Sequence, residues 1–149
     1  MPILLVTAPS NVGPGERKQM LDAARAFFVK GGVEISEVVR IDVPGRGAGE
    51  AGDGLLRGEL ESMVPLLQSG SLFGEASGLE LVDAQNLQVA EIDIFDELVR
   101  SADLTSVHVV ALVAGSPGKK LASTFADLGS KVSISKMWER QAGEWLTSE

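Results

Sequence analysis

The sequence predicts an α/β domain built on a five-stranded parallel sheet that is covered by helices on both faces. Five short apolar or β-branched runs alternate with segments of helical periodicity, and parallel strands need helical crossovers of this kind. The 149 residues suit one domain, and a content of 44% hydrophobic and 23% charged residues is ordinary for a soluble globular protein. The chain has no cysteine, which excludes disulfides and thiolate metal ligands.

Each element follows from a local pattern. Strands are predicted by apolar or alternating runs at residues 3–7, 34–43, 79–82, 107–114 and 131–135. Helices are predicted by apolar residues at three- and four-residue spacing in residues 16–30, 56–67, 92–99 and 116–128. Pro65 is expected to kink or restart the second helix. The most apolar run is 107–114, so we expect this strand at the centre of the sheet.

The first strand leads into a glycine-bearing loop and a helix, which is where nucleotide-binding α/β proteins hold phosphate. The loop, residues 8–18, contains Gly13 and Gly15. A Walker A loop needs a lysine directly after its last glycine and then a hydroxyl residue, but here the lysine is displaced to Lys18 and no Ser or Thr follows it. The sequence therefore does not predict an ordinary ATP site.

The third predicted strand runs into Asp83, which resembles the magnesium-supporting aspartate of a Walker B strand. The next position, where a glutamate would orient the attacking water, is Ala84, so we expect no hydrolysis. We interpret Gly13, Gly15, Lys18 and Asp83 as a degenerate nucleotide site. An ordinary polar residue at a strand end remains the alternative for Asp83.

An apolar pair stands in the predicted turn Ser71-Leu72-Phe73-Gly74-Glu75, between a helix and a strand. Burying either side chain would stabilise the protein by roughly 1.5 to 3 kcal/mol. We therefore expect either the core of this domain or another protein to cover Leu72 and Phe73, and both alternatives are open at this point.

The order of elements, the incomplete Walker loop, SLFGE followed by LELVDAQN, and the run AGSPGKKLASTFADLGSKVSISK resemble one known family. It is the delta subunit family of the bacterial DNA polymerase III clamp loader. The resemblance implies a three-layer fold of the P-loop NTPase and AAA+ type over residues 1–136. Residues 137–149 would begin a following helical lid domain that is truncated here. The loop TAPSNVGPGERK is longer and richer in glycine than the family pattern.

The resemblance also implies a function. Delta subunits bind and open the ring-shaped sliding clamp without hydrolysing ATP, and their clamp-binding hydrophobic pair corresponds to Leu72 and Phe73, with Ser71 in the same turn. The implied partners are the clamp (beta subunit) and the delta-prime and tau/gamma subunits, with DNA reached only through the complex. A formal charge of -8 agrees with the absence of direct DNA binding by this chain, because binding to a phosphate backbone requires clustered Lys and Arg.

These observations lead to an expectation of a non-catalytic, cytoplasmic protein with no cofactor, no metal and no membrane association. The apolar run at the N-terminus is too short for a signal peptide or a membrane span, and no basic residue precedes it. The alternative function is a divergent P-loop protein that binds a nucleotide through loop 8–18 and uses Asp83 for magnesium.

Overall fold

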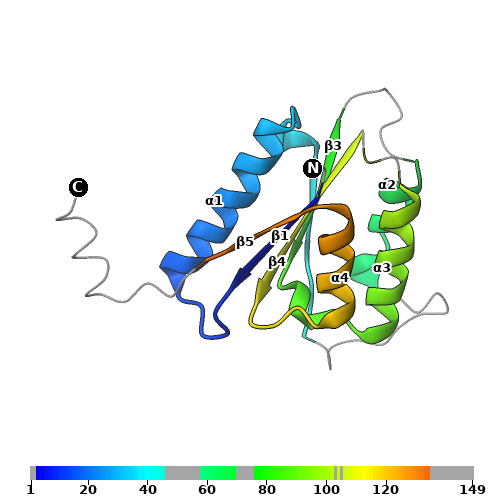
Figure 1. The fold of residues 1–149 in the computed structure, drawn as a ribbon. Helices are drawn as coiled ribbons and strands as arrows, with labels where there is room; N and C mark the ends of the chain where they lie inside the picture. The colour runs from blue at the N-terminus through cyan, green and yellow to red at the C-terminus, as the bar shows by residue number, and fades with distance from the viewer. Residues whose placement is uncertain (1–2, 46–57, 70–75, 103, 105, 135–149) are drawn as a thin grey trace.

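The computed structural model of the chain describes residues 3–45, 58–69, 76–102, 104 and 106–134, and within them it forms a three-layer α/β domain (Figure 1). The strands are β1 (Ile3–Ala8), β2 (Val38–Asp42), β3 (Ser77–Val82), β4 (Val107–Ala114) and β5 (Ser130–Ser133). The α-helices are α1 (Pro14–Lys30), α2 (Met63–Ser69), α3 (Val89–Ser101) and α4 (Lys119–Leu128). Three 3₁₀ turns join them, η1 (Ile35–Glu37), η2 (Gly58–Leu60) and η3 (Ala84–Asn86).

All five strands lie parallel in one sheet, in the order β2-β3-β4-β1-β5. The predicted five-stranded parallel sheet is therefore confirmed. β4 is the middle strand, and six of its eight residues are buried, as its apolar run predicts. β5 lies at one edge beside β1, and its four residues are exposed.

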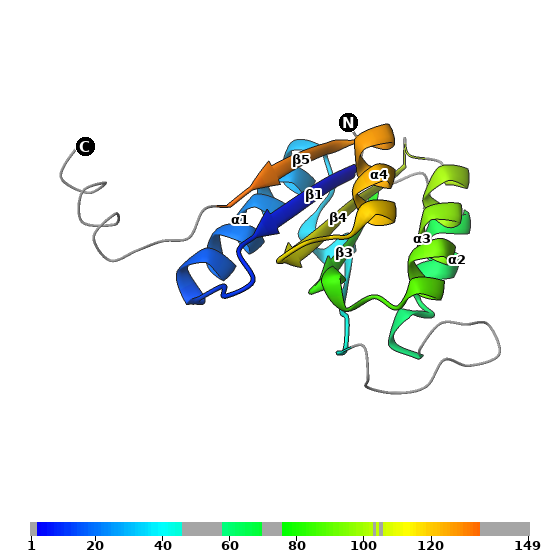
Figure 2. The ribbon, with the colours of Figure 1, turned by 60° about the horizontal axis from the view of Figure 1, so that its bottom comes forward.

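Helices cover both faces of the sheet, and the two faces form two separate apolar cores. On one face, α1 buries Met20, Ala24 and Phe28 against alternate residues of β1 and β4, including Leu4 and Val110. On the other face, α2, α3 and α4 pack against the remaining side chains of the same strands, as two views of the fold show (Figures 1 and 2). No helix among the described residues is long and apolar enough to cross a bilayer.

Several element boundaries differ from the predictions, and three of the differences have a local explanation. β2 begins at Val38 rather than Glu34, because the N–H of Glu37 donates to the carbonyl of Glu34 and closes a 3₁₀ turn ahead of the strand. α4 begins at Lys119 rather than Ser116, after a glycine at φ +81°. The predicted helix at 56–67 restarts as α2, with Pro65 in the first turn, where a missing N–H breaks no intrahelical bond.

Candidate functional site

The strand order reverses between β1 and β4, and this reversal marks the expected ligand position. The chain leaves β1 through α1 toward β2, whereas it leaves β4 through α4, on the opposite face, toward β5. Open α/β sheets bind ligands outside the carboxyl ends of the strands at such a point. Here the ends of β1 and β4 are joined by a hydrogen bond from the N–H of Gly115 to the carbonyl of Ala8, at 2.8 Å.

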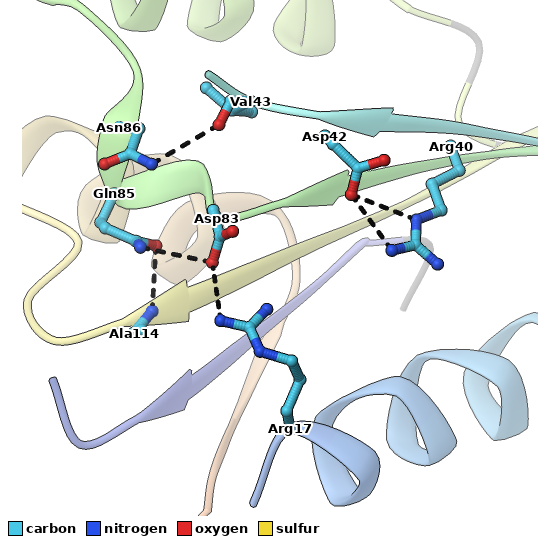
Figure 3. A network of polar contacts seen from close by, with 8 residues as sticks. All are labelled: Arg17, Arg40, Asp42, Val43, Asp83, Gln85, Asn86 and Ala114. Atoms are coloured by element: carbon cyan, nitrogen blue, oxygen red, sulfur yellow. Dashed lines mark hydrogen bonds and ion pairs between the residues drawn. The ribbon is translucent and has the colours of Figure 1, made fainter. Parts of the chain in front are cut away.

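Asp83 lies at this edge and is paired with a cation from the same chain (Figure 3). It adopts the left-handed conformation, with φ 62° and ψ 46°, which turns the chain from β3 into η3. Its Oδ1 accepts hydrogen bonds from Arg17 Nη2 and from Gln85 Nε2, each at 3.4 Å. Gln85 Oε1 in turn accepts the N–H of Ala114 at 3.0 Å, so one side-chain network links α1 to the ends of β3 and β4.

The Arg17–Asp83 pair has little weight for stability, because both side chains are partly exposed, at 45% and 31%. Pairs of this kind contribute about 0.2 to 1 kcal/mol. Its consequence is electrostatic. The carboxylate that would hold magnesium beside a nucleotide already has a positive partner, and Ala84, where a water-orienting acid would stand, is buried.

The N-terminus of α1 also carries its own anion. Glu16 is only 3% exposed, and its Oε1 accepts the N–H of Gly13, the N-cap residue, at 3.0 Å. The first residue of the helix is Pro14, which has no N–H to offer a ligand. A phosphate at a helix N-terminus needs free N–H groups and an uncompensated positive dipole end. Pro14 leaves one N–H group fewer for a phosphate, and the side chain of Glu16 accepts the N–H of Gly13 and offsets the positive end of the helix dipole.

The structure does not bring the other predicted site residues into a phosphate cradle. Lys18 projects into solvent with its side chain 77% exposed, and its Nζ pairs with Asp22 Oδ2 at 2.9 Å. Gly13 is the extended N-cap of α1 and Gly15 is the second residue of the helix. Neither is among the positive-φ glycines of the described residues, so neither uses the backbone freedom that a phosphate loop takes from glycine.

The sequence did not predict the pairing of Arg17 with Asp83 or the capping interaction of Glu16. A detectable signal existed for Glu16, because an acid at the third helical position after a loop is the pattern of an N-terminal capping interaction. Asp83 and the loop after β1 were placed correctly at one edge of the sheet.

Two further polar contacts lie near this edge, one between η3 and the chain after β2 and one within β2. Asn86 Nδ2 donates to the carbonyl of Val43 at 3.5 Å, and Arg40 pairs with Asp42 along β2 at 3.1 Å (Figure 3). Burial raises the pKa of Glu80 on β3, although Arg40 acts in the opposite direction. Within the described part of the chain, no group of three or more His, Asp or Glu side chains is arranged to hold a metal ion.

His108 is a packed residue of β4, as its valine neighbours predict. Its ring meets Phe27 edge-on with centroids 6.1 Å apart, and its Nδ1 is buried without a hydrogen-bond partner. Burial lowers the pKa of His108, so the neutral form is favoured. Its packing against Phe27 and the lack of a polar partner for Nδ1 do not suit a general base.

The predicted clamp-binding residues Ser71, Leu72 and Phe73 lie outside the described residues, as do residues 137–149. The described elements before and after residues 70–75 are α2 and β3. The chain enters β3 at the amino edge of the parallel sheet, opposite the edge that carries Asp83.

Comparisons with known proteins support the fold. No protein-family model matches the chain, and no curated protein matches it significantly. Among solved structures, the ORC2 protein of Aeropyrum pernix, determined as ADPNP and ADP complexes, is similar with a TM-score of 0.50 and 10% sequence identity. The match covers 97% of this chain and 44% of the ORC2 chain, so this chain spans less than half of that protein. The likeness, together with the parallel sheet, shows that the α/β fold of this chain is similar to part of the ORC2 fold.

Proposed function

We propose that this chain is a non-catalytic AAA+-like module of the clamp-loader delta type, which binds and opens a sliding clamp without hydrolysing ATP. The observation that carries the proposal is the charge arrangement at the carboxyl edge. There Arg17 pairs with Asp83, and the carboxylate of Glu16 caps α1. An AAA+-like fold whose phosphate and magnesium positions are taken by its own side chains is suited to binding rather than to nucleotide chemistry.

The catalytic requirements of phosphoryl transfer support this interpretation. Hydrolysis needs a phosphate cradle, a bound metal ion and a group that orients water. Glu16 caps the helix N-terminus at which a phosphate would bind, and Arg17 pairs with Asp83, the carboxylate that would bind the metal ion. Ala84 stands at the position of the water-orienting group and has no polar side chain. A replication role also agrees with the likeness of the fold to ORC2.

In the proposed function, Leu72 and Phe73, with Ser71 in the same turn, insert into a hydrophobic pocket of the clamp. Apolar anchors in such pockets behave as hot spots, and truncation of each costs about 2 kcal/mol or more. The module would open the ring by binding its sprung form more tightly than its closed form, so that binding energy offsets the energy of closure. The delta-prime and tau/gamma subunits would be its other partners, and DNA would be reached only through the complex.

The test is surface plasmon resonance on immobilised cognate clamp, comparing the wild-type chain with Leu72→Ala/Phe73→Ala. A matched control is Val29→Ala/Val89→Ala, which removes two exposed apolar side chains elsewhere, 59% and 74% exposed. We expect the first variant to lose binding and the control to retain it, with circular dichroism spectra of all three alike. Equal binding by the wild type and the Leu72/Phe73 variant, or no binding by the wild type at high micromolar concentration, would contradict the proposal.

The second candidate function is a divergent nucleotide-binding protein that uses loop 8–18 and Asp83. Its support is the shared fold with ORC2, which was determined with ADPNP and ADP. A nucleotide present at a hundred times its Kd stabilises a protein by about 2.7 kcal/mol, which raises the Tm of a domain of this size by roughly 5 to 10 °C. Millimolar Mg-ADP or Mg-ADPNP should produce no such shift if the charge arrangement blocks the site. A shift of that size would favour the second candidate.

A further inference from the structure

A groove lies between α2 and α3, which pack side by side in the helical layer (Figures 1 and 2). Its volume is about 850 Å³. Apolar side chains from both helices line it, Val64 and Pro65 from α2 and Ile94 and Leu98 from α3. None of its lining residues belongs to the Asp83 network, so it is a separate feature of the molecule.

The apolar residues of α3 that line the groove also pack against the core of this domain. The core-facing side chains of that helix are Phe95 and Val99, which are completely buried. Ile94 and Leu98 precede them by one residue each and form a second stripe at i, i+4 spacing, only partly buried. Apolar residues at this spacing on a helix normally face a neighbouring helix. Here the neighbouring helix is α2, and the part of the second stripe that α2 leaves uncovered lines the groove.

The charges of the groove are of one sign. Its charged lining residues are Glu61, in the turn just before α2, and Glu97 on α3, both exposed, and no Lys or Arg lines it among the described residues. The nearest basic residue along α3, Arg100, is engaged by Asp96 at 2.9 Å and Asp127 at 2.8 Å. An apolar floor with a carboxylate on each side is complementary to an apolar stripe flanked by positive charge.

We propose that the α2–α3 groove binds an amphipathic helix of a partner protein, with apolar residues at i, i+4 spacing and flanking Lys or Arg. A helix laid in a groove between two helices is a recurrent mode of recognition. The acidic lining disfavours nucleic acid, and a net charge of -8 on each chain disfavours a second copy of the protein. The proposal is independent of clamp binding, because it uses α2 and α3 and not the turn at 71–75.

The probe is a labelled synthetic peptide of about 14 residues with leucines at i, i+4 and i+7 and lysines beside them. A second peptide carries glutamate in place of every lysine. Fluorescence anisotropy with the full chain should show saturable binding of the lysine peptide and much weaker binding of the glutamate peptide. In NMR spectra of the labelled protein, the lysine peptide should shift amide signals of α2 and α3 and leave those of residues 83–86 and 114–118 unchanged.

Charge-reversal variants locate the site. Glu61→Lys/Glu97→Lys should weaken the lysine peptide about fivefold or more. Glu34→Lys/Glu37→Lys makes the same change in net charge at exposed positions beside α1, and binding should stay within about twofold of the wild type. The proposal is overturned by equal effects of the two variants, by amide shifts outside α2 and α3, by no saturable binding, or by sedimentation that shows a dimer closed through this groove.

Discussion

Glu16 provides the sharpest test of how the carboxyl edge is organised. Its carboxylate accepts the N-cap N–H and lies in the first turn of α1, with 3% exposure. The capping hydrogen bond contributes about 1 kcal/mol, and a negative charge at a helix N-terminus adds about 0.3 to 1 kcal/mol. Glu16→Ala removes both and should lower the free energy of unfolding by about 1.5 to 2 kcal/mol. Glu16→Gln keeps an acceptor oxygen and should lose only the charge contribution, about 0.5 kcal/mol.

The opposing effect is desolvation, since a carboxylate this buried has given up most of its contact with water. Urea unfolding followed by circular dichroism separates the two effects. The control is Asp22→Ala, which removes an exposed acid from the same helix, paired with Lys18 at i, i+4, and should cost about 0.3 to 0.5 kcal/mol. If Glu16→Gln proves more stable than the wild type, the carboxylate is not favourable at the helix N-terminus, and the reasoning that it replaces a phosphate there fails.

Two further predictions concern the fold. Gly129→Ala should destabilise the domain by about 1 to 3 kcal/mol, because its Cβ would overlap the backbone of β1. Gly58→Ala should be nearly neutral in the same urea assay, because its Cβ would meet no atom of the described residues within 4 Å. Equal urea midpoints for the Gly129→Ala and Gly58→Ala variants would contradict this prediction. Asp96→Asn should cost about 1 to 2 kcal/mol at pH 7. Burial acts to raise the pKa of Asp96, but hydrogen bonds from Thr124 and Arg100 outweigh it and hold the pKa below 3.8. The contribution is therefore fully present above pH 3.8 and lost as the pH falls through the lowered pKa, so the variant and the wild type should converge in strong acid. A difference that persists unchanged below that pKa would contradict the assignment.

The fold could be predicted because the period of apolar residues reports burial directly. The run from Val107 to Ala114 contains no charged residue, and a strand of that kind must be covered on both faces, which the central position of β4 confirms. The boundaries that were wrong depend on single local features. One is the hydrogen bond between Glu37 and Glu34, and another is the positive φ of Gly118. Hydrophobic periodicity does not encode either.

The site could be located from the sequence, but not its internal pairing. Loop 8–18 and Asp83 follow parallel strands, so topology alone brings them to one edge. Which cation reaches Asp83 depends on helical phase, since successive residues are turned by about 100° around an α-helix. Arg17 faces the sheet edge, whereas Lys18 faces solvent and Asp22. A motif search fixes attention on the lysine, although the neighbouring arginine makes the contact.

This pairing bears on how such a module would work inside a larger assembly. In a nucleotide-driven domain, the ends of β1, β3 and β4 are held differently with and without the ligand's charge. Here Arg17, Asp83 and Gln85 connect α1 to the ends of β3 and β4 within the chain itself. Under the proposed function, any nucleotide-driven movement would therefore have to come from neighbouring subunits. The two testable contacts of this domain would then be Leu72 and Phe73 of the predicted turn and the α2–α3 groove, which shares no residue with the Asp83 network.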